Sequence, residues 1–165
     1  MNQRNNEILS GVAADTLEQL AFLFSFPGDG RSETDLDSAL AARVLFTGPF
    51  SGALLIIVSD PVLSELTSNM LGVDSEQETT ADQKDDALKE TINVICGNLL
   101  PAVAGKESVF DMDAPKIIRD PEEIKAAVEK YNGEPPTSTA MLDIDGELCG
   151  LYLFGDARQI DRSLE

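Results

Sequence analysis

The amino-acid sequence predicts an α+β fold with helices packed on a largely antiparallel sheet. Stretches with helical spacing of apolar residues alternate with pairs of short apolar stretches, and turn-forming residues separate the members of each pair. A length of 165 residues, of which 42% are hydrophobic, suits one domain with a core of its own. We therefore expect a single domain over residues 1–165, with an ordered core at 5–156 and a polar tail at 157–165.

The N-terminal third predicts a helix followed by a β-hairpin. Apolar residues recur at helical spacing from Asn5 to Phe26, and Pro27-Gly28 ends the pattern. Strands are expected at 43–47 and 53–59, joined by a turn that contains Gly and Pro. The second strand is apolar on both faces, so it should lie in the middle of a sheet that helices cover.

Two helices are expected next. Asp60-Pro61 supplies an N-cap and a first-turn proline, and Gly72 ends this short helix. An acidic loop from Asp74 leads into a long helix at about 82–104. Pro101 lies inside the long helix and should kink it or end its regular part.

The last third predicts an extended stretch, a helix and a second hairpin. Pro115 confines the extended stretch to a sheet edge or a bend, Asp120-Pro121 starts the helix, and Asp145-Gly146 is a strong hairpin turn. The expected ranges are 108–118 for the stretch, 120–131 for the helix, and 139–144 and 147–154 for the strands.

The composition excludes several classes of function. The 12 Lys and Arg against 30 Asp and Glu give a net charge of −18 and a pI near 4.1. That balance argues against nucleic-acid binding and against an anionic membrane surface as a partner. The chain has no histidine, so a nucleophile served by a histidine base and a metal site with histidine ligands are excluded.

The sequence also indicates a cytoplasmic protein. No strongly apolar run approaches the ~20 residues of a membrane helix, and the N-terminus shows no signal peptide. Cys96 and Cys149 lie in apolar surroundings and form no close pair in the sequence. We expect two buried thiols in a reducing compartment.

The long helix carries the functional signal. One apolar stripe should face the core, made of Leu88, Ile92, Ile95, Cys96 and Leu99. The opposite side carries a polar ribbon of four residues: Asp86, Glu90, Asn93 and Gly97. An ordinary solvated helix face is the simplest interpretation. Two residues argue against this interpretation. Gly97 lowers the stability of a helix by roughly 1 kcal/mol relative to Ala, and Asn93 is a poor helix former. Both residues suit a surface that another protein approaches closely.

The spacing Asp86-x-x-x-Glu90-x-x-Asn93, followed by Gly97-Asn98 and by Pro115, resembles the signature of the CheC and CheX chemotaxis phosphatases. It is most similar to CheX-like proteins, and the order of helices and hairpins over about residues 8–155 is similar as well. The resemblance implies a CheC/CheX-like fold and a homodimer. It also implies the dephosphorylation of a phosphorylated response regulator, CheY or a CheY-like receiver, in bacterial chemotaxis or two-component signalling.

The resemblance implies catalytic roles for Glu90 and Asn93, which in this family enter the active site of the regulator. Asp86 and Gly97, on the same face, are expected to contact the partner. A carboxamide takes no proton at pH 7, so Asn93 would orient the water that attacks the aspartyl phosphate. Glu90, three residues earlier on the same face, would pair with the receiver's lysine. No metal or cofactor of its own is expected for this chain, and the Mg²⁺ would belong to the receiver.

Two other hypotheses stay open. The chain is also similar to flagellar-switch middle domains, which use a comparable fold for assembly, and the polar ribbon would then be a non-catalytic contact surface. A structural dimer with a merely solvated ribbon is the third hypothesis. The first helix has Glu18-x-x-Ala21 where a two-site relative repeats Glu-x-x-Asn, which implies one site per chain. The helix at 120–131 looks like an addition to the family fold.

Overall fold

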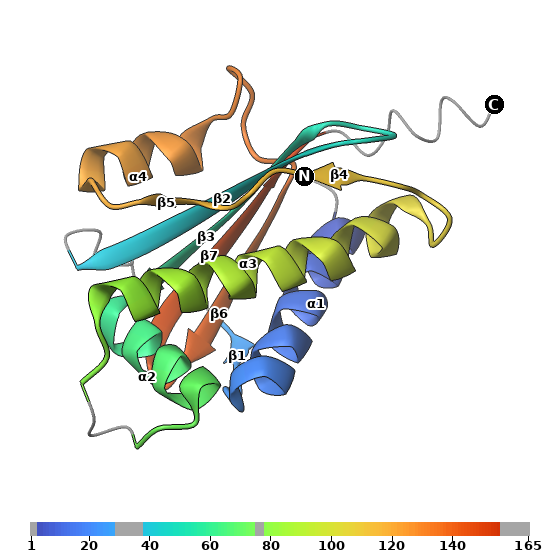
Figure 1. Ribbon diagram of the computed structural model, residues 1–165. Helices are drawn as coiled ribbons and strands as arrows, with labels where there is room; N and C mark the ends of the chain where they lie inside the picture. Colours follow the sequence, from blue (N-terminus) through green and yellow to red (C-terminus); the bar gives the residue numbers. More distant parts are fainter. Residues whose placement is uncertain (1–2, 29–37, 75–77, 156–165) are drawn as a thin grey trace.

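The computed structural model describes residues 3–28, 38–74 and 78–155. In this part of the chain, four helices pack on one seven-stranded antiparallel sheet, which confirms the predicted fold class (Figure 1). The helices are α1 (Gln3–Ala21), α2 (Asp60–Leu71), α3 (Ala81–Ala104) and α4 (Pro121–Glu129). The strands are β1 (Phe26–Pro27), β2 (Ala39–Thr47), β3 (Gly52–Ser59), β4 (Asp111–Met112), β5 (Lys116–Ile118), β6 (Ser138–Ile144) and β7 (Glu147–Phe154). The predicted polar tail at 157–165 lies outside the described residues.

The sheet joins two hairpins side by side. Its strand order is β1-β6-β7-β3-β2-β4, and β5 also pairs with β2. The hairpins β2–β3 and β6–β7 were both predicted, and they meet where β3 pairs with β7. β4 and β5 lie on either side of Pro115 at the β2 edge, which confirms an edge position for the stretch at 108–118.

Helices cover both faces of the sheet, so the domain has three layers (Figure 1). One core cluster combines α1, α2 and α3 with one face of the strands. The second combines the opposite face of β2 and β3 with Ile124 of α4. All eight residues of β3 are buried, as expected for a strand apolar on both faces. Helix α4, which was interpreted from the sequence as an addition, therefore covers the second face of the sheet.

The β2–β3 turn is held by close packing at its ends. The rings of Phe46, Phe50 and Phe110 contact one another edge to face, with centroids 5.3–5.8 Å apart. Gly52 opens β3 against the end of β7, where an added Cβ would stand 1.8 Å from the carbonyl oxygen of Phe154. A side chain at position 52 would therefore collide with backbone.

The first helix ends at Ala21, five residues before the predicted end at Phe26. Phe22 takes a φ of +53°, which stops the helical path, although its N–H still donates to the Glu18 carbonyl oxygen at 3.0 Å. Asn69 of α2 donates through Nδ2 to the Ala21 carbonyl oxygen at 2.7 Å and satisfies an acceptor that the helix end leaves open. The chain then forms β1, which was not predicted and which pairs with β6.

Two other helix boundaries also differ from the prediction. Ser59, and not Asp60, is the N-cap of α2, while Gly72 ends that helix in a left-handed conformation as expected. α4 begins after the predicted N-cap Asp120 but ends at Glu129, earlier than expected. It stops there because Tyr131 and Glu134 pair their backbone groups across a turn.

The β6–β7 turn has the conformation that its sequence predicts. Asp145 and Gly146 both have positive φ, +54° and +84°, which matches the twist of a two-residue hairpin. The Asp143 side chain accepts a hydrogen bond from the Gly146 N–H at 2.8 Å. The hairpin register places Ile144 opposite Glu147.

Glu65 of α2 faces the β6–β7 turn. Burial raises the pKa of Glu65, and the charge of Asp145 and a side-chain hydrogen bond with it raise the pKa further. Because the pKa of Glu65 is higher in the folded state, the pair stabilises the fold below the usual pKa of a glutamate, and this contribution is lost as the pH rises through the folded value. At neutral pH two carboxylates then repel each other.

We expect Glu65→Gln to increase the free energy of unfolding at pH 7 by up to about 1 kcal/mol, because it removes this repulsion. The gain should disappear below about pH 4, where a protonated glutamate resembles glutamine. Urea denaturation at both pH values measures the difference. An equal gain in unfolding free energy at both pH values would contradict the repulsion between Glu65 and Asp145.

The candidate active face of helix α3

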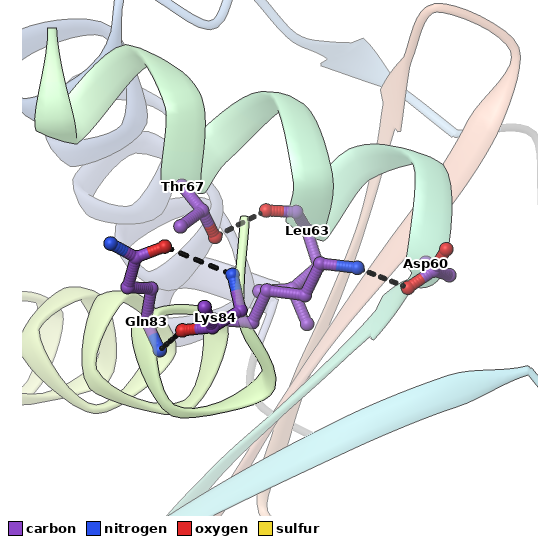
Figure 2. A network of polar contacts seen from close by, with 6 residues as sticks. Asp60, Leu63, Thr67, Gln83 and Lys84 are labelled. Carbon is purple, nitrogen blue, oxygen red and sulfur yellow. Dashed lines mark hydrogen bonds and ion pairs between the residues drawn. The ribbon is translucent and has the colours of Figure 1, made fainter. Parts of the chain in front are cut away.

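The N-terminus of α3 is fixed by a capping box. The Gln83 N–H donates to Thr80 Oγ1 at 3.1 Å, and the Thr80 N–H donates to Gln83 Oε1 at 2.9 Å. One residue later, Lys84 Nζ pairs with Asp60 Oδ1 of α2 at 3.2 Å (Figure 2). The first turn of the helix is therefore attached to α2 as well as capped.

A second ion pair joins α3 to another element. Asp85 Oδ2 pairs with the Arg119 guanidinium, which lies between β5 and α4. The two ion pairs connect the N-terminal part of α3 to different elements. Neither ion pair was predicted from the sequence, because the partners lie 24 and 34 residues apart and no local pattern signals such a contact.

The buried side of α3 confirms the predicted stripe. Its buried residues are Ala87, Leu88, Thr91, Ile92, Ile95, Cys96, Leu99 and Leu100. The Thr91 hydroxyl donates to the Ala87 carbonyl oxygen at 2.8 Å, which satisfies the one polar side chain in this set. The stripe packs in the core cluster shared with α1, α2 and the sheet.

The four residues of the polar ribbon are all solvent-exposed: Asp86, Glu90, Asn93 and Gly97. The structure thus places all four predicted site residues on the face of α3 away from its buried stripe. Glu90 and Asn93 are one helical turn apart, a spacing at which two side chains can reach the same ligand atom or two adjacent ones. Their chemical roles remain predictions.

Gly97 has open space around it. An added Cβ would meet no atom within 4 Å beyond its own helix and chain neighbours, so packing within the chain does not require glycine there. The helix does not end at Pro101 but continues to Ala104. Proline has no N–H, so the Gly97 carbonyl, four residues earlier, receives no backbone hydrogen bond from position 101. Because Gly97 has no side chain, the surface of α3 is flat at this position.

The other reactive groups of the chain are poorly placed for catalysis. Cys96 and Cys149 are buried and unbridged, as predicted, and burial raises the pKa of each thiol to about 12. Both are therefore protonated and unreactive at neutral pH. Among residues 3–28, 38–74 and 78–155, no three Cys, Asp or Glu side chains gather closely enough to hold a metal ion.

The first helix offers no second copy of the ribbon. Glu18 is exposed, but Ala21, where the repeated motif would carry Asn, is fully buried at the end of α1. An asparagine there would have to enter the core or shift the helix end. The described structure is consistent with one ribbon per chain.

The family model for the chemotaxis phosphatase CheX matches residues 40–134, more than half of the chain. The chain belongs to the CheX family. The match includes the whole of α3 and its polar ribbon, and its range also spans α4, the helix interpreted from the sequence as an addition. No curated protein sequence matches this CheX-family protein.

Solved structures agree on the fold. A CheX from Vibrio vulnificus superposes with a TM-score of 0.68 at 15% identity and covers 94% of this chain and 100% of its own. CheX in a CheX–CheY–BeF3–Mg²⁺ complex from Borrelia burgdorferi gives 0.60 at 16% identity, covering 90% and 96%. FliY from Thermotoga maritima gives 0.57 at 15% identity, covering 99% and 96%. At these identities the likeness concerns the fold alone. Within the described residues, no helix of this CheX-family protein is long and apolar enough to span a bilayer.

Proposed function

We propose that this CheX-family protein hydrolyses the aspartyl phosphate of a CheY-like receiver. The observation that carries the proposal is the position of Glu90 and Asn93, exposed together on one face of a helix whose other face is packed in the core. A family of chemotaxis phosphatases and a related CheX in complex with CheY support the same substrate class.

In this proposal Asn93 positions the attacking water. Its carboxamide accepts through oxygen and donates through nitrogen, so it can bind a water and a phosphoryl oxygen at the same time without changing protonation. Holding the water in line with the phosphorus supplies catalysis by orientation, as expected for phosphoryl transfer.

Glu90 would dock the helix. Its carboxylate accepts hydrogen bonds from an ammonium group, such as the receiver's lysine, and this contact would fix the distance of Asn93 from the phosphate. Asp86 and Gly97 would lie at the two ends of the contact, and the flat surface at Gly97 would admit the receiver's backbone. The Mg²⁺ would remain part of the receiver. We also propose that the protein is cytoplasmic, as receivers are, and a homodimer like its CheX-like relatives.

The test is phosphate release from receivers phosphorylated with acetyl phosphate, with and without substoichiometric amounts of this protein. We expect a faster release that scales with protein concentration and continues over many turnovers. No acceleration with any receiver of the source organism would contradict the proposal.

A non-catalytic interaction module is the second candidate, because the fold also matches FliY at a TM-score of 0.57. In that case the polar ribbon would bind a partner without turnover. Binding to a receiver that saturates at one equivalent and leaves its phosphate lifetime unchanged would support this candidate over the phosphatase.

Replacing Gly97 separates folding from docking. We expect Gly97→Ala to stabilise the fold by about 0.5–1 kcal/mol, because it removes a helix-interior glycine where the new methyl group meets no neighbour. The same methyl group should weaken receiver docking several-fold if the receiver approaches this surface. Thermal unfolding and the KM for phosphorylated receiver measure the two effects, and a stabilised variant with unchanged KM would remove Gly97 from the contact.

A further inference from the structure

A second exposed surface lies where α1 ends, away from the polar ribbon. Three of the seven phenylalanines of the chain point into solvent there: Phe22 is 74% exposed, Phe24 63% and Phe26 70%. Leu23, which alternates with them, is buried. We call these three residues the phenylalanine patch. A single exposed apolar side chain needs no explanation, but three exposed phenylalanines within five residues concentrate apolar surface in one segment.

The backbone beneath the patch is also unfavourable for its sequence. Phe22 has a φ of +53°, a region that Gly or Asn adopts readily and that costs a bulky residue about 1–2 kcal/mol. Its ring gains little from the core in return, since most of it is exposed. The left-handed turn ends α1, where the N–H groups of Phe22 and Leu23 donate to the carbonyl oxygens of Glu18 and Leu17, but this turn does not require a phenylalanine, and the exposed ring adds little to the core.

The patch adjoins the end of α2 and the β6–β7 turn. Asn69 of α2 donates to the Ala21 carbonyl, directly before Phe22. Leu71, the last residue of α2, is 48% exposed. Phe26 pairs with Asp143 of β6. Figure 1 shows that the ends of α1 and α2, β1 and the tip of the β6–β7 hairpin lie together at the lower edge of the molecule.

The elements that form this edge carry acidic side chains and no basic ones of their own. Residues 15–28, α2 and the β6–β7 hairpin contain no Lys or Arg. Their acidic side chains include Glu18, one turn before Phe22, and the pair Glu65 and Asp145, which lie close enough for the charge of Asp145 to raise the pKa of Glu65. The apolar patch is therefore bordered by negative charge that these elements leave uncompensated.

We propose that the phenylalanine patch docks a basic amphipathic segment of another protein, with its apolar side on the three rings and its cations on the surrounding carboxylates. The partner is distinct from the receiver proposed for α3, because the two surfaces lie on different elements. A second copy of this chain is a poor occupant of this patch, since its own patch would bring the same negative charge to the contact. An anionic membrane is disfavoured for the same reason.

The proposal is tested with a lysine–leucine peptide that forms a basic amphipathic helix, labelled for fluorescence anisotropy. A lysine–serine peptide with the same charge and a glutamate–leucine peptide with the same apolar face are the comparison probes. The variant carries Phe22→Asn, Phe24→Ser and Phe26→Ser, in which Asn suits the positive φ. The matched control is Val109→Ser, which removes an apolar side chain 78% exposed elsewhere on the surface.

We expect the triple variant to bind the lysine–leucine peptide at least about tenfold more weakly than wild type, while Val109→Ser binds as wild type does. The lysine–serine peptide should bind weakly and equally to all three proteins, and the glutamate–leucine peptide should not bind. Unchanged receiver dephosphorylation by the triple variant keeps this test separate from the proposed phosphatase function.

Three results would overturn the proposal. Equal affinity of wild type and triple variant for the lysine–leucine peptide would show that net charge alone binds it. Loss of a wild-type dimer in the triple variant, measured by sedimentation, would identify the patch as a self-interface. Patch-dependent cosedimentation with phosphatidylcholine vesicles would identify a membrane surface instead. Should the triple variant fail to fold, Phe24→Ser alone, with its ring in solvent, repeats the comparison.

Discussion

Replacing Asn93 by alanine should abolish the acceleration of receiver dephosphorylation while the free energy of unfolding stays within about 0.5 kcal/mol of wild type. The side chain is exposed and packs against no core residue, so its removal leaves the buried stripe of α3 intact. Alanine also favours helix more than asparagine does. If Asn93 orients the hydrolytic water, the variant loses the orientation that lowers the activation barrier. We expect the rate of hydrolysis to fall 100-fold or more, which corresponds to a rise of about 3 kcal/mol in the barrier.

The matched control is Gln19→Ala. Gln19 is an exposed carboxamide on helix α1, outside the polar ribbon and outside the signature of α3, so its replacement removes the same chemical group from another surface. Phosphate release by both variants, with receiver in excess, gives the comparison. Equal loss in the two, or full activity of Asn93→Ala, would argue against the proposed role. A variant that binds the receiver normally and turns over slowly is the expected signature.

The largest stability effect is expected at Gly52. The Gly52→Ala variant should lose about 3 kcal/mol or more of unfolding free energy, because its Cβ would stand 1.8 Å from the Phe154 carbonyl oxygen. The obstacle is backbone, so no rotamer change can relieve it. The pairing of β3 with β7, which joins the two hairpins, would have to open at this end.

Gly11→Ala is the comparison for Gly52. Gly11 lies within α1, and an added Cβ there meets nothing within 4 Å, so the substitution should stabilise the protein. Urea denaturation measures the change in unfolding free energy of both variants. The same replacement of glycine by alanine should lower it at position 52 and raise it at position 11. A Gly52→Ala protein as stable as wild type would mean that the β3 and β7 ends can separate at little cost.

The sequence is most informative where a short local pattern determines the structure. The buried and exposed sides of α3 follow from helical periodicity, and the Asp145-Gly146 turn follows from residues that tolerate positive φ. The burial of β3 follows from its unbroken apolar run. The candidate site was therefore predictable, since it depends on one helix and one spacing.

Features that depend on distant residues were not predictable. The end of α1 at Ala21 depends on Asn69 of α2, 48 residues later, whereas the apolar residues up to Phe26 continue the helical pattern. The ion pairs of Lys84 and Arg119 likewise join elements far apart in the sequence. A helical periodicity of apolar residues shows which side of a segment is apolar. It does not show whether that side is buried or, as in the phenylalanine patch, exposed to solvent.

The attachment of α3 also has a thermodynamic consequence for catalysis. Because the helix is capped, ion-paired at two residues and packed along its length, its backbone is already ordered before any partner arrives. Docking then immobilises the side chains of the ribbon, at about 0.5–1.5 kcal/mol each, and no loop has to fold. Under the proposed function, a weak and short-lived encounter between α3 and a receiver would therefore be enough for hydrolysis, because little of the binding free energy is spent on ordering the helix.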